Sequence, residues 1–263
     1  MTARLGRYGP PVATLVIGVG LWELAVRVLG VREPIWPAPS AIGTALLENW
    51  GAGRWALADS AVATLLEALG GLVIGTAAGI VVAFAVSRWL TARDAILPIA
   101  VAANAIPIIA IAPIFNNWFG VTNPFSKMMI AALLVFFPIM INVTRGLSEV
   151  HPSAIELMRS YAASEWTVIR KVRIPNALPY FLTALKVATT LALIGAIVGE
   201  YFGGSSGVIG RVVVQSASAL RFDVTWAAIL LAAVFGVALY LVIVAIERTL
   251  IPWHSSVRGD EPA

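Results

Sequence analysis

Seven polar side chains interrupt apolar stretches of this chain, and their residue types limit the chemistry that they could perform. They are Glu67, Asn104, Asn116, Asn117, Asn142, Lys186 and Glu200. Because polar groups are costly inside a membrane, such residues indicate a substrate pathway, an ion pathway or pairing between helices. The asparagine amides could hydrogen-bond a heterocyclic or oxyanion substrate, with hydrogen bonds between helices as the alternative. We predict a structural pair between Lys186 and Glu67, and we expect Glu200 either to line the pathway or to be solvated.

Residues suited to catalysis or metal binding are scarce. The 263 residues include no cysteine and only two histidines, His151 and His254, which are far apart in sequence. No lysine follows a glycine, so the GxxxxGK[ST] loop that binds nucleotide phosphates is absent. We therefore predict that the chain is not an enzyme, that it has no catalytic residues, metal or cofactor of its own, and that any ATP energy arrives through a partner.

The elements that must position these residues are membrane-spanning helices. The chain is 59% hydrophobic and 12% charged, about half the charge of a soluble domain. A spanning helix needs about 20 apolar residues. Six segments qualify, at about 11–30, 60–87, 95–115, 126–146, 177–201 and 224–250. The sequence predicts an all-α membrane protein with six transmembrane helices in a single transmembrane domain over residues 1–263.

The distribution of basic residues predicts the orientation of these helices. If the N-terminus lies inside, the inner loops and tails hold eleven Lys and Arg residues and the outer loops hold five. Cytoplasmic loops carry this excess, so we expect both termini in the cytoplasm. A retained first helix is favoured over a cleaved signal peptide, because the apolar run contains Glu23 and Arg27. On the outer side, residues 202–222 form either a simple loop or a loop with a short re-entrant helix.

The segment 153–175 lies between the fourth and fifth spans and is expected in the cytoplasm. Ser153 and Glu156 have capping-box spacing just after Pro152, which predicts a helix start. Pro175 and Pro179 should limit how far this helix extends. Apolar residues recur every three or four positions and build one helical face. They are Ile155, Met158, Tyr161, Ala162, Trp166, Ile169 and Val172. An amphipathic helix held outside the bilayer indicates that a soluble partner binds it.

The amino-acid sequence of this segment resembles the cytoplasmic Glu-Ala-Ala motif of permease subunits in bacterial binding-protein-dependent ABC importers, of the nitrate, sulfonate and taurine group. The matching stretches are Glu156–Ser164 with Trp166 and Val172–Pro175, WPAPS at Trp36–Ser40, IPIIAIAPIFNNWFG at Ile106–Gly120, and GAIVGEYFGG at Gly195–Gly204. Two departures are Leu157-Met158 in place of Ala-Ala and Ala162 in place of the usual Gly. Ala162 suggests a turn with ordinary backbone dihedrals.

The resemblance implies a type I ABC importer permease in the bacterial cytoplasmic (inner) membrane. Two cytoplasmic ATPase subunits would bind ATP and Mg, and an extracytoplasmic solute-binding protein would deliver substrate. The other partners are a second permease copy, with a homodimer favoured, and membrane lipid; nucleic acid is not expected. Residues 153–170 would form a coupling helix that transmits ATP-driven motion. The expected coupling residues are Glu156, Arg159, Tyr161, Ala162, Ala163, Ser164, Trp166 and Pro175.

The substrate is predicted from a finer resemblance. FNNWFG and ELMRSYAAS are similar to permeases for thiamine pyrimidine precursors or riboflavin, which favours a small polar heterocycle. Nitrate, sulfonate or taurine is the alternative for the same machinery. An ion-coupled secondary transporter using Glu67 and Glu200 is a less favoured reading, because the inverted repeats of such proteins are not visible.

Overall fold

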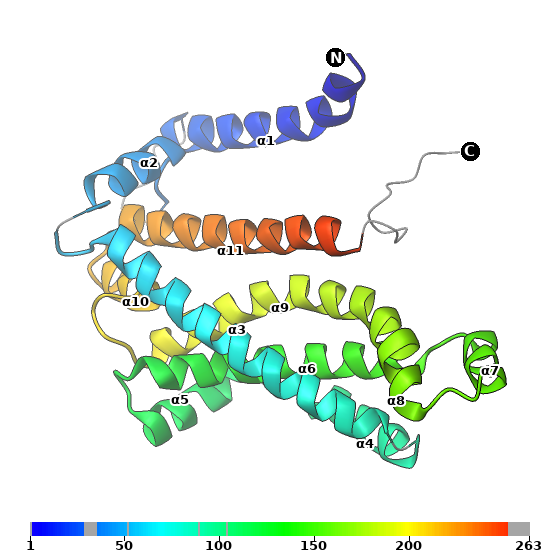
Figure 1. Ribbon diagram of the computed structural model, residues 1–263. Coiled ribbons are helices and arrows are strands. Elements are labelled where there is room, and N and C mark those ends of the chain that lie inside the picture. The colour runs from blue at the N-terminus through cyan, green and yellow to red at the C-terminus, as the bar shows by residue number, and fades with distance from the viewer. Residues whose placement is uncertain (1, 29–35, 52, 89, 104, 252–263) are drawn as a thin grey trace.

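The computed structural model describes residues 2–28, 36–51, 53–88, 90–103 and 105–251, and this part of the chain is helical, without strands (Figure 1). The elements are α1 (Thr2–Val28), α2 (Pro39–Glu48), α3 (Leu57–Ser87), α4 (Leu90–Ala103), α5 (Ile108–Phe119), α6 (Pro124–Ser148), α7 (Pro152–Ser160), α8 (Glu165–Val168), the π-helix η1 (Ile169–Arg173), α9 (Ile174–Phe202), α10 (Ile209–Ser218) and α11 (Phe222–Leu250).

Five described helices are long and apolar enough to cross a membrane: α1, α3, α6, α9 and α11. They correspond to five of the six predicted spans. Membrane spans are helical because a helix satisfies its own backbone hydrogen bonds in lipid. The predicted span 95–115 is not one continuous helix. It is divided into α4 and α5, and Pro107 stands at the N-cap of α5. Proline cannot donate a backbone hydrogen bond and pushes the preceding residue out of helical geometry, which explains the break.

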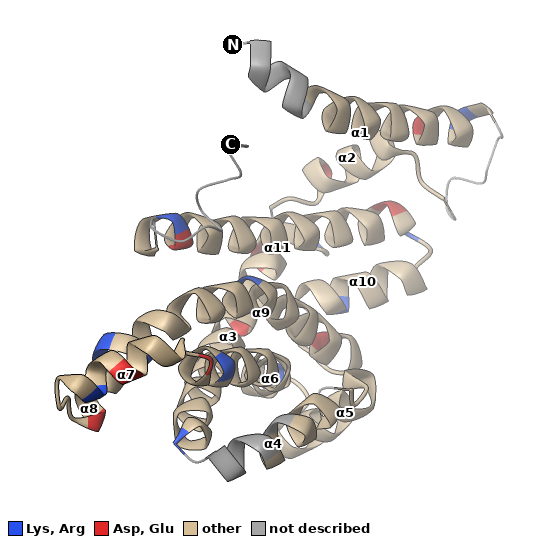
Figure 2. Cartoon of the chain, turned by 90° about the vertical axis from the view of Figure 1, so that its right-hand side faces the viewer, with Lys and Arg blue, Asp and Glu red and all other residues tan. Residues whose placement is uncertain are grey.

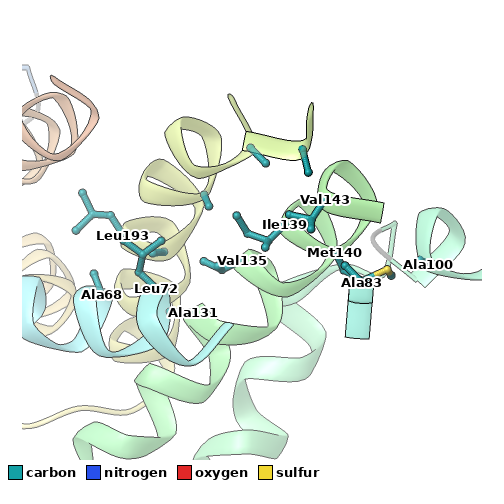
Figure 3. Close-up of a cluster of buried hydrophobic side chains, with 14 of the residues drawn as sticks. Ala68, Leu72, Ala83, Ala100, Ala131, Val135, Ile139, Met140, Val143 and Leu193 are labelled. Carbon is teal, nitrogen blue, oxygen red and sulfur yellow. The ribbon is translucent and has the colours of Figure 1, made fainter. Parts of the chain in front are cut away.

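Helices α3, α6 and α9 pack together as the centre of the bundle. Glycines on α3 let its backbone approach α6 closely: a Cβ atom at Gly71 would lie 2.4 Å from the Ala131 side chain, and one at Gly75 would lie 2.5 Å from the Ala132 carbonyl oxygen. Such small-residue contacts favour close packing of membrane helices. The buried side chains of the centre include Leu72, Val135, Ile139, Val143 and Leu193 (Figure 3).

A second buried cluster joins α2, α10 and α11 to the start of α3. Helix α1 is largely exposed and is joined to α2 by hydrogen bonds between Glu23 and Ser40. Glu23 accepts hydrogen bonds from the backbone N–H of Ser40 at 3.0 Å and from the Ser40 hydroxyl at 2.8 Å, and it pairs with Arg27 at 2.6 Å. The residue at the N-cap of α2, Ala38, has no capping side chain. Glu23 therefore caps α2 from a different helix.

The bundle has two distinct ends (Figure 1). The α7 end carries α7, α8, the start of α1 and the end of α11. The α10 end carries α2, α10 and the turn between α5 and α6. Charged residues gather on the α7–α8 region and are sparse along the spanning helices (Figure 2). The start of α1 and the end of α11 thus lie on the same side of the bundle as α7.

Candidate functional site

Helix α7 begins at Pro152, but not by the predicted capping box. His151 occupies the N-cap position and makes no capping hydrogen bond, and the Ser153 hydroxyl lies 2.7 Å from Nδ1 of His151. Glu156 is exposed on the helix surface. The capping-box prediction was therefore wrong. Proline at the first helical position, with its preset φ, starts the helix instead.

The turn after α7 is left-handed at Ala162, which has φ +48°. The Ala162 N–H donates to the Arg159 carbonyl at 2.9 Å, and the Ala163 N–H donates to the Met158 carbonyl at 3.0 Å. This pair of bonds is the Schellman arrangement, which requires a left-handed residue just past the helix end. The expectation of ordinary dihedrals at Ala162 was wrong, because the hydrogen bonds that end α7 impose the conformation that glycine adopts most easily.

The chain then enters a second helix, so the predicted coupling segment is two helices and not one. The Ser164 hydroxyl caps α8 by accepting from the Thr167 N–H at 3.3 Å. From Glu165 the helix runs on through η1 and α9 to Phe202, a stretch of 38 residues. Pro175 does not end it. The wider π-turn at Ile169–Arg173, just before Pro175, accommodates a ring that would clash with the carbonyl four residues earlier in an α-helix.

Large apolar side chains are exposed on this segment. Leu157 is 56% exposed, Tyr161 74% and Trp166 67%, and none of the residues of α7 is buried. Of the other predicted coupling residues, Arg159, Ala162, Ser164 and Pro175 are also exposed and Ala163 is half-buried. Exposed apolar side chains outside the spanning bundle, rimmed by polar residues, mark an interaction surface. We name Leu157, Tyr161 and Trp166 the docking residues.

The residues predicted for a substrate pathway are spread over different environments. Asn116 is buried and both its polar atoms are hydrogen-bonded within the chain: its Nδ2 donates to the Gly199 carbonyl at 2.9 Å, and its Oδ1 accepts from the Ser126 hydroxyl at 2.9 Å. Asn142 is half-buried and donates within its own helix, to Pro138 at 2.8 Å. Asn117 is exposed. Asn104 lies outside the described residues.

Glu200 is buried within a charged cluster at the α10 end. Its Oε2 accepts from the Gly210 N–H at 2.7 Å, while Oε1 of Glu200 and Oε2 of Glu67 have no hydrogen-bond partner among the described residues. The buried Lys127 is the neighbouring cation, and its Nζ donates to the carbonyls of Val121 and Asn123. The expectation of a solvated Glu200 was wrong.

The same cluster holds the start of α10. The Ile209 N–H donates to the Thr64 hydroxyl at 2.9 Å, next to the bond from Gly210 to Glu200. The N-cap residue of α10, Val208, has no capping side chain. The first free N–H groups of α10 are therefore satisfied from α3 and α9. Residues 202–222 contain a helix, which decides between the two alternatives for this region in favour of a helical element.

Lys186 pairs with Glu247, and the predicted pair with Glu67 was wrong. Its Nζ lies 2.8 Å and 3.0 Å from the two carboxylate oxygens of Glu247, joining α9 to α11. Sequence reasoning missed Glu247 and the burial of Lys127. Both could have been noticed as charges at positions where the surrounding apolar residues recur with helical spacing.

The chain also contains a short catalytic-looking pattern. Residues Gly203–Gly207 read GGSSG and fit GxSxG, which in acyl-transfer enzymes places a serine on a turn from a strand to a helix. Here the pattern follows α9, and the described part of the chain has no strand. The described residues also contain no group of three or more His, Asp and Glu residues placed to hold a metal ion.

Comparisons with known proteins agree with this architecture. Residues 75–252 match the family model of the binding-protein-dependent transport system inner membrane component. The chain is 31% identical to a "Probable ABC transporter permease protein" of Haemophilus influenzae over 86% of this chain and 91% of that protein. It is 31% identical to the "Formylaminopyrimidine transport permease protein ThiX" of Halalkalibacterium halodurans over 89% and 91% of the two chains.

A further relative is the "Riboflavin transport system permease protein RibX" of Chloroflexus aurantiacus, 30% identical over 94% of this chain and 91% of that protein. Among solved structures, the fold is similar to a chain of the MetNI methionine ABC transporter in an inward-facing conformation, with a TM-score of 0.58, 19% identity, and coverage of 73% of this chain and 93% of that chain. The chain belongs to the family of binding-protein-dependent transport system inner membrane components, and it is a multi-pass ABC importer permease, the non-catalytic subunit of the transporter.

Proposed function

We propose that the docking residues of this permease bind a cytoplasmic ATPase and that the ATPase drives a small polar organic solute through the membrane by alternating access. The single observation that carries the proposal is the exposure of Leu157, Tyr161 and Trp166 outside the spanning bundle. Aromatic residues are enriched where interfaces bind most strongly. ATP and Mg would be bound by the partner.

The path of the chain supports this coupling role. Helix α7 is connected to α6 on one side, and α8 continues into α9 on the other. The chain therefore leaves the bundle at the end of α6, passes through the docking residues, and returns to the bundle at the start of α9. A push on α7 and α8 would be passed to α6 and α9 as rigid-body motion, which can switch access between two sides of a membrane. Glu156, Arg159 and Ala163 would complete the contact.

The remaining partners follow from the same arrangement. The start of α1 and the end of α11 lie at the α7 end, which supports termini on the cytoplasmic side (Figure 1). An extracytoplasmic binding protein would then deliver substrate at the α10 end. We propose that two permease copies, as a homodimer within membrane lipid, carry two ATPase subunits.

For the substrate we propose a heterocycle, either a thiamine pyrimidine precursor or a riboflavin-like molecule. Two relatives aligned over most of their length carry formylaminopyrimidine and riboflavin in their names. Nitrate, sulfonate or taurine is the alternative, since a taurine permease of Escherichia coli is 27% identical over 94% of this chain. Asn104, Asn117 and Asn142 are the pathway residues to test, because Asn116 and Glu200 are buried in contacts within the subunit.

The test is purification of the tagged permease from its native membrane, with ATP hydrolysis assayed on the complex. We expect a stoichiometric ATPase that is lost on Tyr161→Asp and on deletion of 156–170. Trp50→Asp is the matched control, because it places the same charge on an exposed aromatic residue at the α10 end and should retain the ATPase.

Substrate class is tested with the same complex in proteoliposomes, with its binding protein added. Uptake of formylaminopyrimidine, riboflavin or taurine that requires ATP identifies the cargo. A permease that purifies alone, and whose transport stops when the proton gradient is removed, would overturn the proposal and favour an ion-coupled transporter.

A further inference from the structure

The segment formed by α7 and α8, which we name the excursion, leaves the bundle after α6 and returns to it at α9. The two ends of this segment are held close together. Asn176, at the start of α9, donates through Nδ2 to the Gly146 carbonyl at 2.7 Å and to the Glu149 carbonyl at 3.2 Å. These bonds join residues 27 and 30 positions apart in sequence. We name Gly146, Glu149, Asn176 and Ala177 the neck.

The neck is also a backbone contact. A Cβ atom at Gly146 would lie 2.6 Å from Cα of Ala177, so glycine is required for α6 and α9 to meet at this point. The carbonyls that Asn176 binds belong to the last turn of α6 and to its C-cap, which have no partner within the helix. One side chain of α9 thus caps the end of α6.

The neck matters because little else restrains α7. No residue of α7 is buried, and the turn Tyr161–Ser164 separates α7 from α8. A force applied to the docking residues reaches the bundle by two routes, through residues 149–151 into α6 and through α8 and η1 into α9. If the two routes could separate at their base, the force would deform the excursion and would not move the spans.

We propose that Asn176 is a positioning residue for energy coupling: by tying the end of α6 to the start of α9, it makes the α7–α8 excursion move both spans together. This inference rests on the proposed function of the docking residues. Asn176 touches no substrate and no nucleotide. Its role is to convert movement at the docking surface into joint movement of α6 and α9.

The experiment uses the purified permease–ATPase complex and needs no knowledge of the substrate. The natural chain contains no cysteine, so Leu47→Cys on α2 and Val121→Cys before α6 can carry spin labels as the only thiols in the permease. Both positions are exposed and lie at the α10 end. Their distance distribution is measured without nucleotide and after trapping with ATP, Mg and vanadate.

Three variants are compared with this labelled wild type. Asn176→Ala removes the side chain, and Asn176→Asp keeps its shape but replaces the donor with oxygens that repel the two carbonyls. Ser87→Ala is the control, because Ser87 donates to Phe84 within the end of α3 and joins no second helix. Copurified ATPase, ATP hydrolysis and melting temperature are recorded for each.

We expect both Asn176 variants to keep the ATPase bound, to hydrolyse ATP within about twofold of wild type, and to lose at least half of the trapped distance change. Ser87→Ala should behave as wild type. A full distance change in Asn176→Asp would overturn the inference, as would loss of bound ATPase or a collapsed melting temperature in both variants. A wild-type complex without ATPase would instead overturn the proposed function.

Discussion

The two ends of the molecule use their side chains in opposite ways. At the α10 end, Glu67, Lys127 and Glu200 are turned inward and are buried. At the α7 end, Tyr161 and Trp166 point outward and remain exposed. Charged groups are therefore buried inside the chain at one end, whereas apolar groups that are costly to expose to water are left uncovered at the other. The charged groups at the α10 end are thus buried by the chain itself, whereas we propose that the ATPase covers the docking residues at the α7 end.

Removal of the buried cation at the α10 end gives the sharpest test of this contrast. Lys127→Met would remove the buried cation beside Glu67 and Glu200 and would leave the carbonyls of Val121 and Asn123 without the Nζ donor. A buried polar group that is left without its hydrogen-bond partner costs about 1–3 kcal/mol, and this variant affects two such carbonyls. We expect a large loss of melting temperature in detergent and little protein in the membrane. Lys171→Met, at an exposed position near α8, should change neither, and equal effects in the two variants would remove the contrast.

The Lys186–Glu247 pair between the two ends should have the next largest effect. Glu247→Gln would leave the partly buried ammonium with a weaker partner, at a cost of about 2 kcal/mol, in the range of hydrogen bonds to charged groups. Thermal unfolding measures the cost. Exchange of the two residues, Lys186→Glu with Glu247→Lys, should recover at least half of it. No recovery would show that packing between α9 and α11, and not the ion pair, is what the single change disrupts.

At the α7 end, stability and binding should separate. Trp166→Ala is expected to weaken ATPase binding by about 30-fold, the 2 kcal/mol typical of a dominant interface residue. The melting temperature of the permease alone should stay unchanged, because exposed substitutions are within about 0.5 kcal/mol of neutral. Binding is measured by titration of the purified ATPase onto the immobilised permease. A fall in melting temperature with unchanged binding would place Trp166 among the structural residues.

The turn between α7 and α8 should give the smallest effect. Ala162→Gly should stabilise the turn by about 0.5–1 kcal/mol, because the left-handed conformation costs alanine about 1–2 kcal/mol and the greater freedom of glycine in the unfolded chain offsets part of the gain. Ala162→Val should destabilise it, because a β-branched residue is poorly accommodated at positive φ. Hydrogen exchange of the Ala163 amide, which binds the Met158 carbonyl, reports both changes. Faster exchange in the glycine variant than in wild type would contradict the strain at Ala162.

Sequence patterns predicted the positions of the helices better than the side-chain contacts between them. Runs of apolar residues located α1, α3, α6, α9 and α11, because membrane burial depends on composition over about 20 residues. The pairing of Lys186 with Glu247 depends on how α9 and α11 are rotated about their axes, and apolar residues on every face leave this rotation undefined. The tertiary caps by Glu23, Glu200 and Asn176 were not predictable, because each joins helix ends that are distant in sequence.

The turn at Ala162 and the passage through Pro175 were missed for a local reason. Residue type suggested ordinary dihedrals at Ala162 and a helix end near Pro175. A left-handed alanine costs only about 1 kcal/mol, which the two hydrogen bonds ending α7 offset. One π-turn was enough to let the helix continue through a proline. Such small energies are decided by the surrounding fold.

The π-turn at Ile169–Arg173 has a consequence for direction as well as continuity. A π-turn amounts to one extra residue in an α-helix, and one residue corresponds to about 100° of rotation about the helix axis. The angular position of Trp166 about this axis is therefore rotated relative to the side chains of α9 that pack into the bundle. Deletion of one residue within 169–173 would swing Trp166 by about a quarter of a circle while α9 kept its place. The number of residues in the π-turn thus sets the direction in which Trp166 points, and the packing of α9 against the bundle does not.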